Sequence, residues 1–225
     1  MLEDKFKRTI GLIGMDSFLK LQEKKIYIAG LGGVGGTTLE VLVRMGFKNF
    51  IIVDRDEVEI SNLNRQILYV EKDIGKAKVE AAKERILSIN SDINVVTHKE
   101  DVLNCLPTSD VDIVVDCIDD IKAKVSLIKS ASEQDIPLIS SMGMANKMDP
   151  SKIKISTINK STVDPLAKKL RYELKKAEID YTNVMCIYSD ETPFKDGNKL
   201  NSLISVTSTA GLYIANYIFN LLNKN

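Results

Sequence analysis

The chain is poor in cysteine and histidine and has no excess of charge of either sign. Its 225 residues include three cysteines and one histidine, and 31 basic residues balance 31 acidic ones. Cys105, Cys117 and Cys186 stand far apart without a CxxC pair, which excludes a disulfide framework and a four-thiolate zinc site and fits a reducing cytosol. The zero net charge gives no global basic field that would attract a nucleic acid, although it does not exclude a local basic patch. We assign no function to His98.

Proline and glycine clusters are few, and no secretory leader is expected. Apolar residues make up 44% of the chain and charged residues 28%, a composition that excludes disorder and fibrous repeats. Residues 1–10 are charged throughout, so we expect no signal peptide. The uncharged stretch Leu200–Asn223 is long enough to cross a bilayer, but Asn, Ser and Thr interrupt it and its apolar residues recur at helical spacing. We expect a half-buried terminal helix in a cytoplasmic protein, with membrane contact as the weaker alternative.

Short apolar runs alternate with helical periodicity over the first two thirds of the chain. The predicted strands are Lys25–Ala29, Asn49–Asp54, Ile93–Thr97, Val111–Cys117 and Ile136–Ser140. The predicted helices are Thr38–Met45, Lys76–Ile89 and Ile121–Ser132. This alternation favours an α/β class, a Rossmann-like and mostly parallel sheet with helices on both faces.

After Pro150 the pattern changes. Strands predicted at Lys152–Ile158 and Asn183–Tyr188 flank a charged helix, Pro165–Ala177, so we expect antiparallel strands to extend the same sheet. No repeat or low-complexity linker divides the chain, which favours a single domain. Its expected parts are an N-terminal helical arm (1–24), a nucleotide-binding half (25–145) and a substrate-facing half that ends in the terminal helix (146–225).

A glycine-rich turn lies between the first predicted strand and the first predicted helix. Gly30, Gly32 and Gly35 satisfy GxGxxG, with Gly33 beside them. Such a turn brings backbone N–H groups at a helix N-terminus close to a phosphate. Asp54 ends the next strand, where a carboxylate can accept hydrogen bonds from ribose hydroxyls. The turn alone leaves NAD, FAD and ATP open.

Cations and acids at the same sheet edge favour a triphosphate. Arg65 and Lys78 can neutralise charge on a transferred α-phosphoryl group and on departing pyrophosphate, and Asn62 adds a neutral donor. Asp116, Asp119 and Asp120 cluster at the C-terminal end of the strand Val111–Cys117, and a magnesium ion needs one or two such carboxylates. A dehydrogenase has no use for this density of amides and cations beyond its ribose acid.

These motifs resemble those of the adenylyltransferases related to ubiquitin-activating enzymes and to the sulfur-carrier activators of thiamine and molybdopterin synthesis. GLGGVGG, D-x-D-x-V-x-x-S-N-L-x-R-Q, G-x-x-K and D-x-x-D cover residues 30 to 120 with that family's spacings. The resemblance implies a ThiF-type ATP-binding domain whose cofactor-binding residues are the four glycines, Asp54, Asp56, Asn62, Arg65 and Lys78. It assigns magnesium to Asp119, although Asp120 replaces an Asn of many members and leaves open which acid takes the metal; a monovalent cation could accompany it.

The same resemblance implies a homodimer. Arg8 matches the N-terminal arginine that reaches the ATP of the neighbouring subunit in this family, so Arg8 joins Arg65, Lys78 and Asp119 among the expected catalytic residues. A solvated helix charge is the alternative for Arg8.

The second half resembles one branch, the tRNA threonylcarbamoyladenosine dehydratases. The matching segments are 149–155, 162–171 and 186–191. The branch implies ATP-dependent adenylation of the carboxylate of threonylcarbamoyladenosine beside the tRNA anticodon, followed by cyclisation to the oxazolone form with release of AMP and pyrophosphate. A sulfur-relay or accessory protein is a further partner to consider. Asn201 and Ser202 stand where some members have a cysteine, so a thiol role at that position does not transfer.

The local charge favours this branch independently. Residues 147–176 hold nine basic residues and three acidic ones, and phosphate contacts from such a strip would bind RNA without sequence preference. The expected tRNA-facing residues are Lys160, Lys168, Lys169 and Arg171. A solvated amphipathic helix explains the same pattern.

Other functions remain open at this point. The main alternative is adenylation of the C-terminal glycine of a ubiquitin-like sulfur-carrier protein. A nicotinamide oxidoreductase would rest on GxGxxG alone, and a non-catalytic nucleotide sensor would leave Arg65, Lys78 and Asp119 unexplained.

Overall fold

The helices and strands follow the predicted alternation. The computed structural model describes residues 2–194, 197 and 199–223. The helices are α1 (Leu2–Ile13), α2 (Met15–Glu23), α3 (Gly33–Met45), α4 (Lys78–Ile89), α5 (Ile121–Glu133), α6 (Pro165–Lys176) and α7 (Ile204–Leu222). The strands are β1 (Lys25–Ala29), β2 (Asn49–Val53), β3 (Asn94–His98), β4 (Ile113–Asp116), β5 (Leu138–Ser141), β6 (Ile153–Thr157) and β7 (Met185–Ser189). Short 3₁₀ turns are η1 (Ile60–Asn62), η2 (Glu71–Asp73), η3 (Val102–Asn104), η4 (Pro150–Lys152) and η5 (Ile158–Lys160).

The order of the strands sets the place of the functional site. Within the described residues the strands form one seven-stranded sheet in the order β3-β2-β1-β4-β5-β7-β6. β1 pairs in parallel with β2 on one side and with β4 on the other, so the chain leaves β1 in one direction and returns later on its other side. In open α/β sheets a crevice forms at the carboxyl ends of the strands at such a switch point, and ligands bind there.

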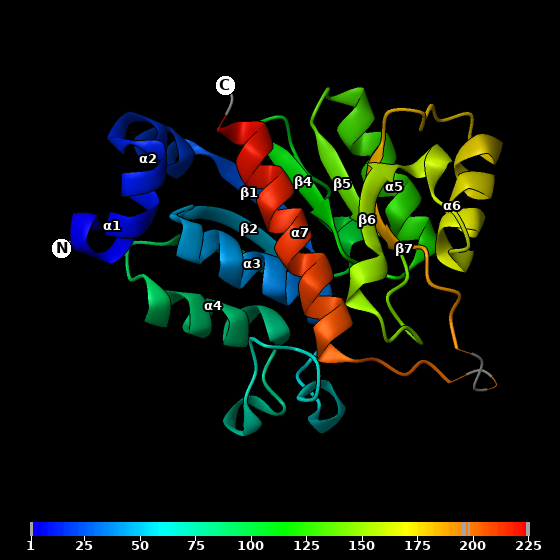
Figure 1. The fold of residues 1–225 in the computed structure, drawn as a ribbon, viewed down its shortest axis with the longest axis horizontal. Helices are drawn as coiled ribbons and strands as arrows, with labels where there is room; N and C mark the ends of the chain where they lie inside the picture. The colour runs from blue at the N-terminus through cyan, green and yellow to red at the C-terminus, as the bar shows by residue number, and fades with distance from the viewer. Residues whose placement is uncertain (1, 195–196, 198, 224–225) are drawn as a thin grey trace.

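Both faces of the sheet are covered, as predicted. Along β1, Ile26 and Ile28 belong to the core shared with α3, α4 and α7, whereas Tyr27 and Ala29 face a second core that includes α5. The alternation follows from the two-residue period of a strand. Figure 1 shows α3, α4 and α7 on one face, and α6 packs against α5 on the other. The α/β class with a mostly parallel sheet is confirmed.

Helix α7 packs unusually closely along α3. A Cβ atom added to Gly211 would lie 2.7 Å from both the Thr37 Cβ and the Val34 carbonyl oxygen. The Thr38 hydroxyl donates a hydrogen bond to the Gly211 carbonyl across the same contact (3.3 Å). The terminal helix is therefore a core element, and among the described residues no helix combines the length and apolar character needed to cross a bilayer.

A charged contact joins α3 to α4. The Glu40 side chain is 7% exposed; its Oε2 accepts from Arg85 Nε (3.0 Å) and its Oε1 from Arg44 Nη2 (2.8 Å). Burial by itself raises the pKa of Glu40, but the hydrogen bonds from Arg85 and Arg44 outweigh burial and hold the pKa below its ordinary value.

Two details differ from the sequence predictions. The antiparallel arrangement holds for β6 against β7, but β7 pairs in parallel with β5, because α6 returns the chain to the edge where the parallel strands begin. Helix α3 starts at Gly33 and not at Thr38. Glycine has a low helix propensity, so the run of glycines gave no helical signal over the first turn of α3, which is part of the glycine-rich turn.

Candidate active site

The glycine-rich turn is shaped by contacts that exclude side chains. Gly30 has φ +86°, and a Cβ there would lie 2.7 Å from the Cys117 carbonyl oxygen. Gly32 is the N-cap of α3 with open space beside it, which leaves room for a ligand at the helix N-terminus. Gly35 has a different role, since its Cβ would lie 1.9 Å from the Gly30 carbonyl oxygen. It packs helix against turn and does not line the cleft described next.

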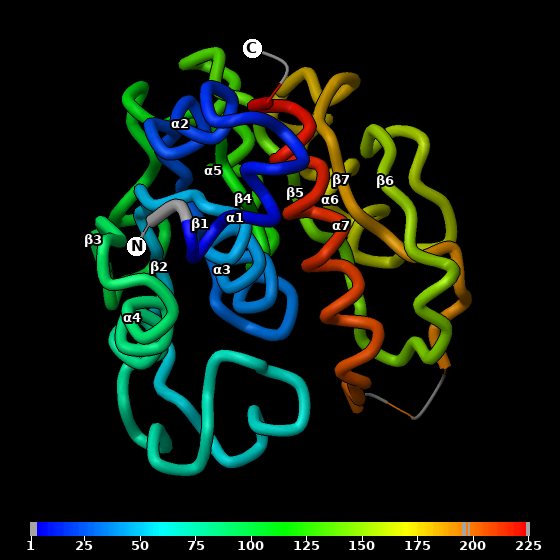
Figure 2. The backbone as a smooth tube through the Cα atoms, turned by 60° about the vertical axis from the view of Figure 1, so that its left-hand side comes forward, coloured from blue at the N-terminus to red at the C-terminus, as the bar shows by residue number. Residues whose placement is uncertain are grey.

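A cleft of about 460 Å³ opens at the carboxyl ends of β1, β2 and β4. Its walls come from the glycine turn, from the β4–α5 turn and from the 55–66 part of a lobe that projects from the sheet between β2 and α4 (Figure 2). The predicted residues that line it are Gly30, Gly32, Gly33, Asp54, Asp56, Asn62, Arg65, Lys78 and Asp119. Residues distant in sequence thus converge as predicted from their positions after strands.

Asp54 holds the glycine turn in place. One carboxylate oxygen accepts from the Leu31 amide (2.7 Å) and the other from the Asp56 amide (2.9 Å). Burial raises the pKa of Asp54, outweighing the nearby Lys78 ammonium and both amide hydrogen bonds. A carboxylate has about four acceptor positions, so two remain for the hydroxyls of a ribose.

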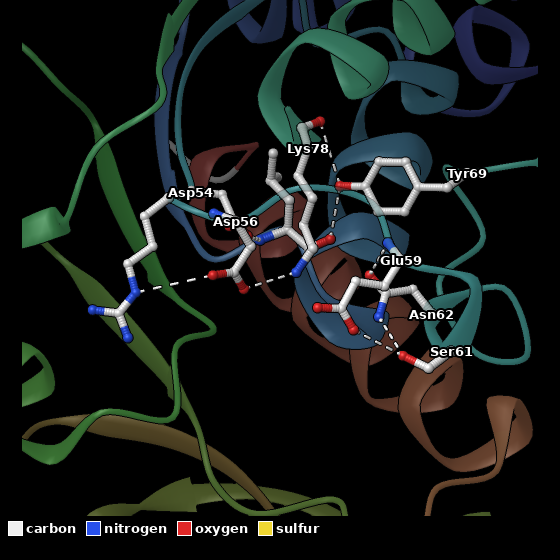
Figure 3. Close-up of polar contacts among 9 residues, drawn as sticks. Asp54, Asp56, Glu59, Ser61, Asn62, Tyr69 and Lys78 are labelled. Atoms are coloured by element: carbon white, nitrogen blue, oxygen red, sulfur yellow. Dashed lines mark hydrogen bonds and ion pairs between the residues drawn. The ribbon is translucent and has the colours of Figure 1, made fainter. Parts of the chain in front are cut away.

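Lys78 and Asp56 form an ion pair at the cleft wall. Lys78 Nζ lies 2.9 Å from Asp56 Oδ2; the lysine side chain is 8% exposed and the aspartate 58% (Figure 3). Tyr69 lies behind, its hydroxyl donating to the Leu31 carbonyl (3.0 Å). A buried ammonium with one exposed anionic partner can exchange that partner for a phosphate oxygen. Lys78 can therefore take its predicted role only if its ion pair with Asp56 breaks.

The segment after Asp56 supplies an amide and a guanidinium. Asn62 is buried, and its Oδ1 accepts from the Glu59 amide (3.2 Å) (Figure 3). Arg65 Nη1 donates to the Ser61 carbonyl (2.6 Å), which leaves other guanidinium donors for a ligand.

The sequence reasoning missed Gln66. Its side chain is 4% exposed and lines the cleft, and within the described residues its Oε1 has no hydrogen-bond partner. An unpaired buried oxygen is costly unless a ligand satisfies it. Its place directly after Arg65 in the D-x-D-x-V-x-x-S-N-L-x-R-Q motif was the available signal.

The three acids near the end of β4 have three different environments. Asp116 is fully buried against Lys124 (Nζ–Oδ2 3.0 Å) and does not line the cleft, so it is removed from the candidate metal ligands. Asp120 caps α5 by accepting from the Ala123 amide (2.8 Å).

Asp119 lines the cleft, is exposed, and has no hydrogen bond or ion pair within the described part of the chain. One free carboxylate in this cleft has the chemistry that Mg²⁺ needs, since the ion takes one or two carboxylates plus substrate phosphates. The described residues contain no cluster of three or more His, Cys, Asp or Glu side chains that would form a protein-only metal site.

Arg8 does not reach this cleft from its own chain. It is exposed on α1, and α1 is attached by Lys5 Nζ to Asn90 Oδ1 (2.8 Å) at the end of α4. That end is roughly 18 Å along the helix from Lys78, at 1.5 Å per residue.

The basic strip is smaller than its sequence indicated. Lys147 is buried against Asp164 (2.9 Å), and Arg171 Nη1 donates to the Ile158 carbonyl (3.0 Å) and to Ser161, so Arg171 supports η5. Lys160, Lys168 and Lys169 are exposed, as are Lys175 and Lys176, and none of the five forms an ion pair within the residues described.

A Rossmann-type sheet with a glycine turn, an acid at the end of β2 and two cations at its switch point defines a nucleotide-binding α/β protein. The chain belongs to the ThiF family, whose sequence model matches residues 6–224.

Several relatives that match most of the chain are named tRNA threonylcarbamoyladenosine dehydratase. The tRNA threonylcarbamoyladenosine dehydratase of Bacillus subtilis is 38% identical over 192 residues, which are 84% of this chain and 75% of that protein. The Escherichia coli protein of the same name is 32% identical over 206 residues, 86% of this chain and 77% of that protein. The solved structure of the E. coli enzyme, TcdA, in complex with ATP has a TM-score of 0.90 at 28% identity and covers 98% of this chain and 94% of its own.

Proposed function

We propose that the chain is an ATP-dependent tRNA threonylcarbamoyladenosine dehydratase. The observation that carries the proposal is the convergence of Asp54, Arg65, Lys78 and Asp119 in one cleft, in a chain that matches TcdA over almost its whole length. The substrates would be ATP and a tRNA whose threonylcarbamoyladenosine lies beside the anticodon.

The first step joins the substrate carboxylate to AMP. A carboxylate oxygen attacks the α-phosphorus, the bond to the β-phosphate oxygen breaks, and pyrophosphate leaves. Arg65 and Lys78 offset the charge on the transferring and departing groups, and each such contact is typically worth about 3 kcal/mol of barrier. Asp54 orients the ribose, and Asp119 would hold Mg²⁺, which supplies Lewis-acid stabilisation of phosphate charge when bound.

The second step needs no protein nucleophile. The carbamoyl oxygen of the substrate attacks the activated carbonyl carbon, a proton leaves a carbamoyl nitrogen, and the bond to AMP breaks. Because the attack is intramolecular, a high effective concentration drives it. The cleft supports this mechanism: among the described residues that line it, the one thiol is Cys117. Burial raises the pKa of Cys117 to about 12, which keeps the thiol protonated at neutral pH.

The proposal includes a homodimer. Arg8 does not line the cleft of its own chain, and the end of α4 to which α1 is bonded lies about 18 Å along the helix from Lys78. A second copy would therefore have to supply Arg8 to the nucleotide. We place the reaction in the cytoplasm, where ATP and tRNA meet. A sulfur-relay or accessory protein and a monovalent cation remain further parts of the hypothesis.

The proposed tRNA-binding surface is the exposed side of α6 with Lys160. Lys168 and Lys169 lie in its early turns, and its N-cap Asp164 lies beside Gly143, just past the carboxyl end of β5. The surface is therefore near the edge at which the cleft opens, and its unpaired ammonium groups suit phosphates.

One assay tests the function. The purified protein is incubated with ATP, Mg²⁺ and modified tRNA, and digested nucleosides are examined by mass spectrometry for a product lighter by one water. The double variant Lys168→Glu, Lys169→Glu should raise KM for tRNA and leave ATP binding intact. Pyrophosphate exchange with a carrier protein ending in Gly-Gly, without the dehydrated nucleoside, would favour the sulfur-carrier alternative and reject the proposal.

A further inference from the structure

A buried ion pair lies directly beneath the turn that carries Asp119. Lys124 of α5 and Asp116 at the end of β4 are both 0% exposed, with Nζ 3.0 Å from Oδ2. Lys124 Nζ also contacts Ser140 Oγ (3.2 Å) and donates to the Ser141 carbonyl (2.8 Å). The three contacts satisfy the ammonium and tie the start of α5 to the ends of two strands.

The carboxylate of this pair also accepts a hydrogen bond from the turn that lines the cleft. Asp116 Oδ1 accepts from the Ile118 amide (3.3 Å), while its Oδ2 accepts from Ser140 Oγ (2.6 Å). Ile118 belongs to the turn 117–120, all four residues of which line the cleft. On its other side the turn is fixed to β1, because the Cys117 amide donates to the Ala29 carbonyl (2.8 Å).

Stability alone is a weak reason for such a pair. The desolvation of two buried charges cancels much of their attraction, and well-packed apolar residues often replace them at little cost. A set of directed hydrogen bonds, by contrast, fixes position. We propose that Lys124 is a positioning residue: through Asp116 it holds the turn 117–120 so that Asp119 faces the phosphates of ATP. This inference rests on the proposed function, since it requires that the cleft bind ATP.

The chain offers a matched control. Lys147 and Asp164 form a second pair that is equally buried (1% and 0% exposed, 2.9 Å), but neither residue lines the nucleotide cleft. The test variants are Asp116→Leu with Lys124→Met, and the control is Asp164→Leu with Lys147→Met. Ser140→Ala is a milder variant that removes one hydrogen bond to Asp116 and tests the same idea if the double variant does not fold.

Calorimetry measures ATP affinity with and without Mg²⁺, and urea unfolding measures the stability of each variant. Loss of a residue that orients a metal ligand typically weakens binding by about 10- to 100-fold, so the gain in affinity from Mg²⁺ should fall at least tenfold in the test variant and less in Ser140→Ala. The control should keep the full gain even where it is less stable.

Two results would overturn the inference. One is a wild-type Mg²⁺ effect in both the test variant and Ser140→Ala; the other is an equal loss in the control. If the wild-type protein binds no ATP, the proposed function fails and the inference fails with it. If the wild-type protein binds ATP and either of the two results above is found, only the inference is rejected.

Discussion

Two neighbouring acids allow a sharp test of the proposed metal position. Asp119 has no partner within the described residues and is exposed in the cleft, so Asp119→Asn should change the free energy of unfolding by less than about 0.5 kcal/mol. The substitution should instead lower the rate of the reaction. Asp119 would act through the Mg²⁺ that it holds, and loss of one electrostatic contact to the transferring group costs about 3 kcal/mol of barrier, which is about 150-fold in rate.

Asp120→Asn is the matched control. Asp120 accepts a hydrogen bond from the Ala123 amide at the start of α5, and Asn caps a helix nearly as well as Asp. We therefore expect near wild-type stability and near wild-type turnover. The assay is the initial rate of dehydrated nucleoside, with urea unfolding in parallel. A large loss of rate in Asp120→Asn with normal activity in Asp119→Asn would refute the assignment.

Three further predictions concern packing, pH and assembly. Gly211→Ala should destabilise the protein by about 1–2 kcal/mol in urea unfolding, because overpacking against α3 exceeds the gain in helix propensity; equal or higher stability would contradict the close contact. Glu40→Gln should cost about 1–3 kcal/mol at pH 7. Since the folded pKa of Glu40 is lowered, this difference should be full above the ordinary pKa of 4.5 and should shrink as the pH falls through the lower folded value; a difference that is constant from pH 7 to pH 3 would argue against the ion pair. Mixing inactive Arg8→Ala and Asp119→Ala subunits should restore about a quarter of wild-type activity if Arg8 acts across a twofold dimer, and no recovery after subunit exchange would place Arg8 outside the site.

The sequence predicted those parts of the site that depend on strand ends. Asp54 and the glycine turn follow buried apolar runs, and parallel strands bring their carboxyl ends to one edge. The direction of β7 could not be predicted in this way, because a two-residue period is the same in parallel and antiparallel strands.

The burial of charged residues was the other feature that the sequence did not predict. Lys147 and Arg171 were assigned to a solvent-facing strip, yet the structure buries Lys147 with Asp164 and bonds Arg171 to η5. In both cases the two partners lie in separate segments of the chain, and the periodicity of a helix or strand does not predict contacts between separate segments. The same holds for Asp116, whose partner Lys124 is identified only by the contact between α5 and the ends of β4 and β5.

The central claim is that the cleft makes a carboxylic acid electrophilic by joining it to AMP. The most direct test uses tRNA whose threonylcarbamoyl carboxylate carries a heavy-oxygen label, incubated with ATP and Mg²⁺. An acyl-adenylate leaves one labelled oxygen on AMP when the ring closes, so mass spectrometry should find AMP heavier by that isotope. Unlabelled AMP, formed together with the dehydrated nucleoside, would contradict the claim.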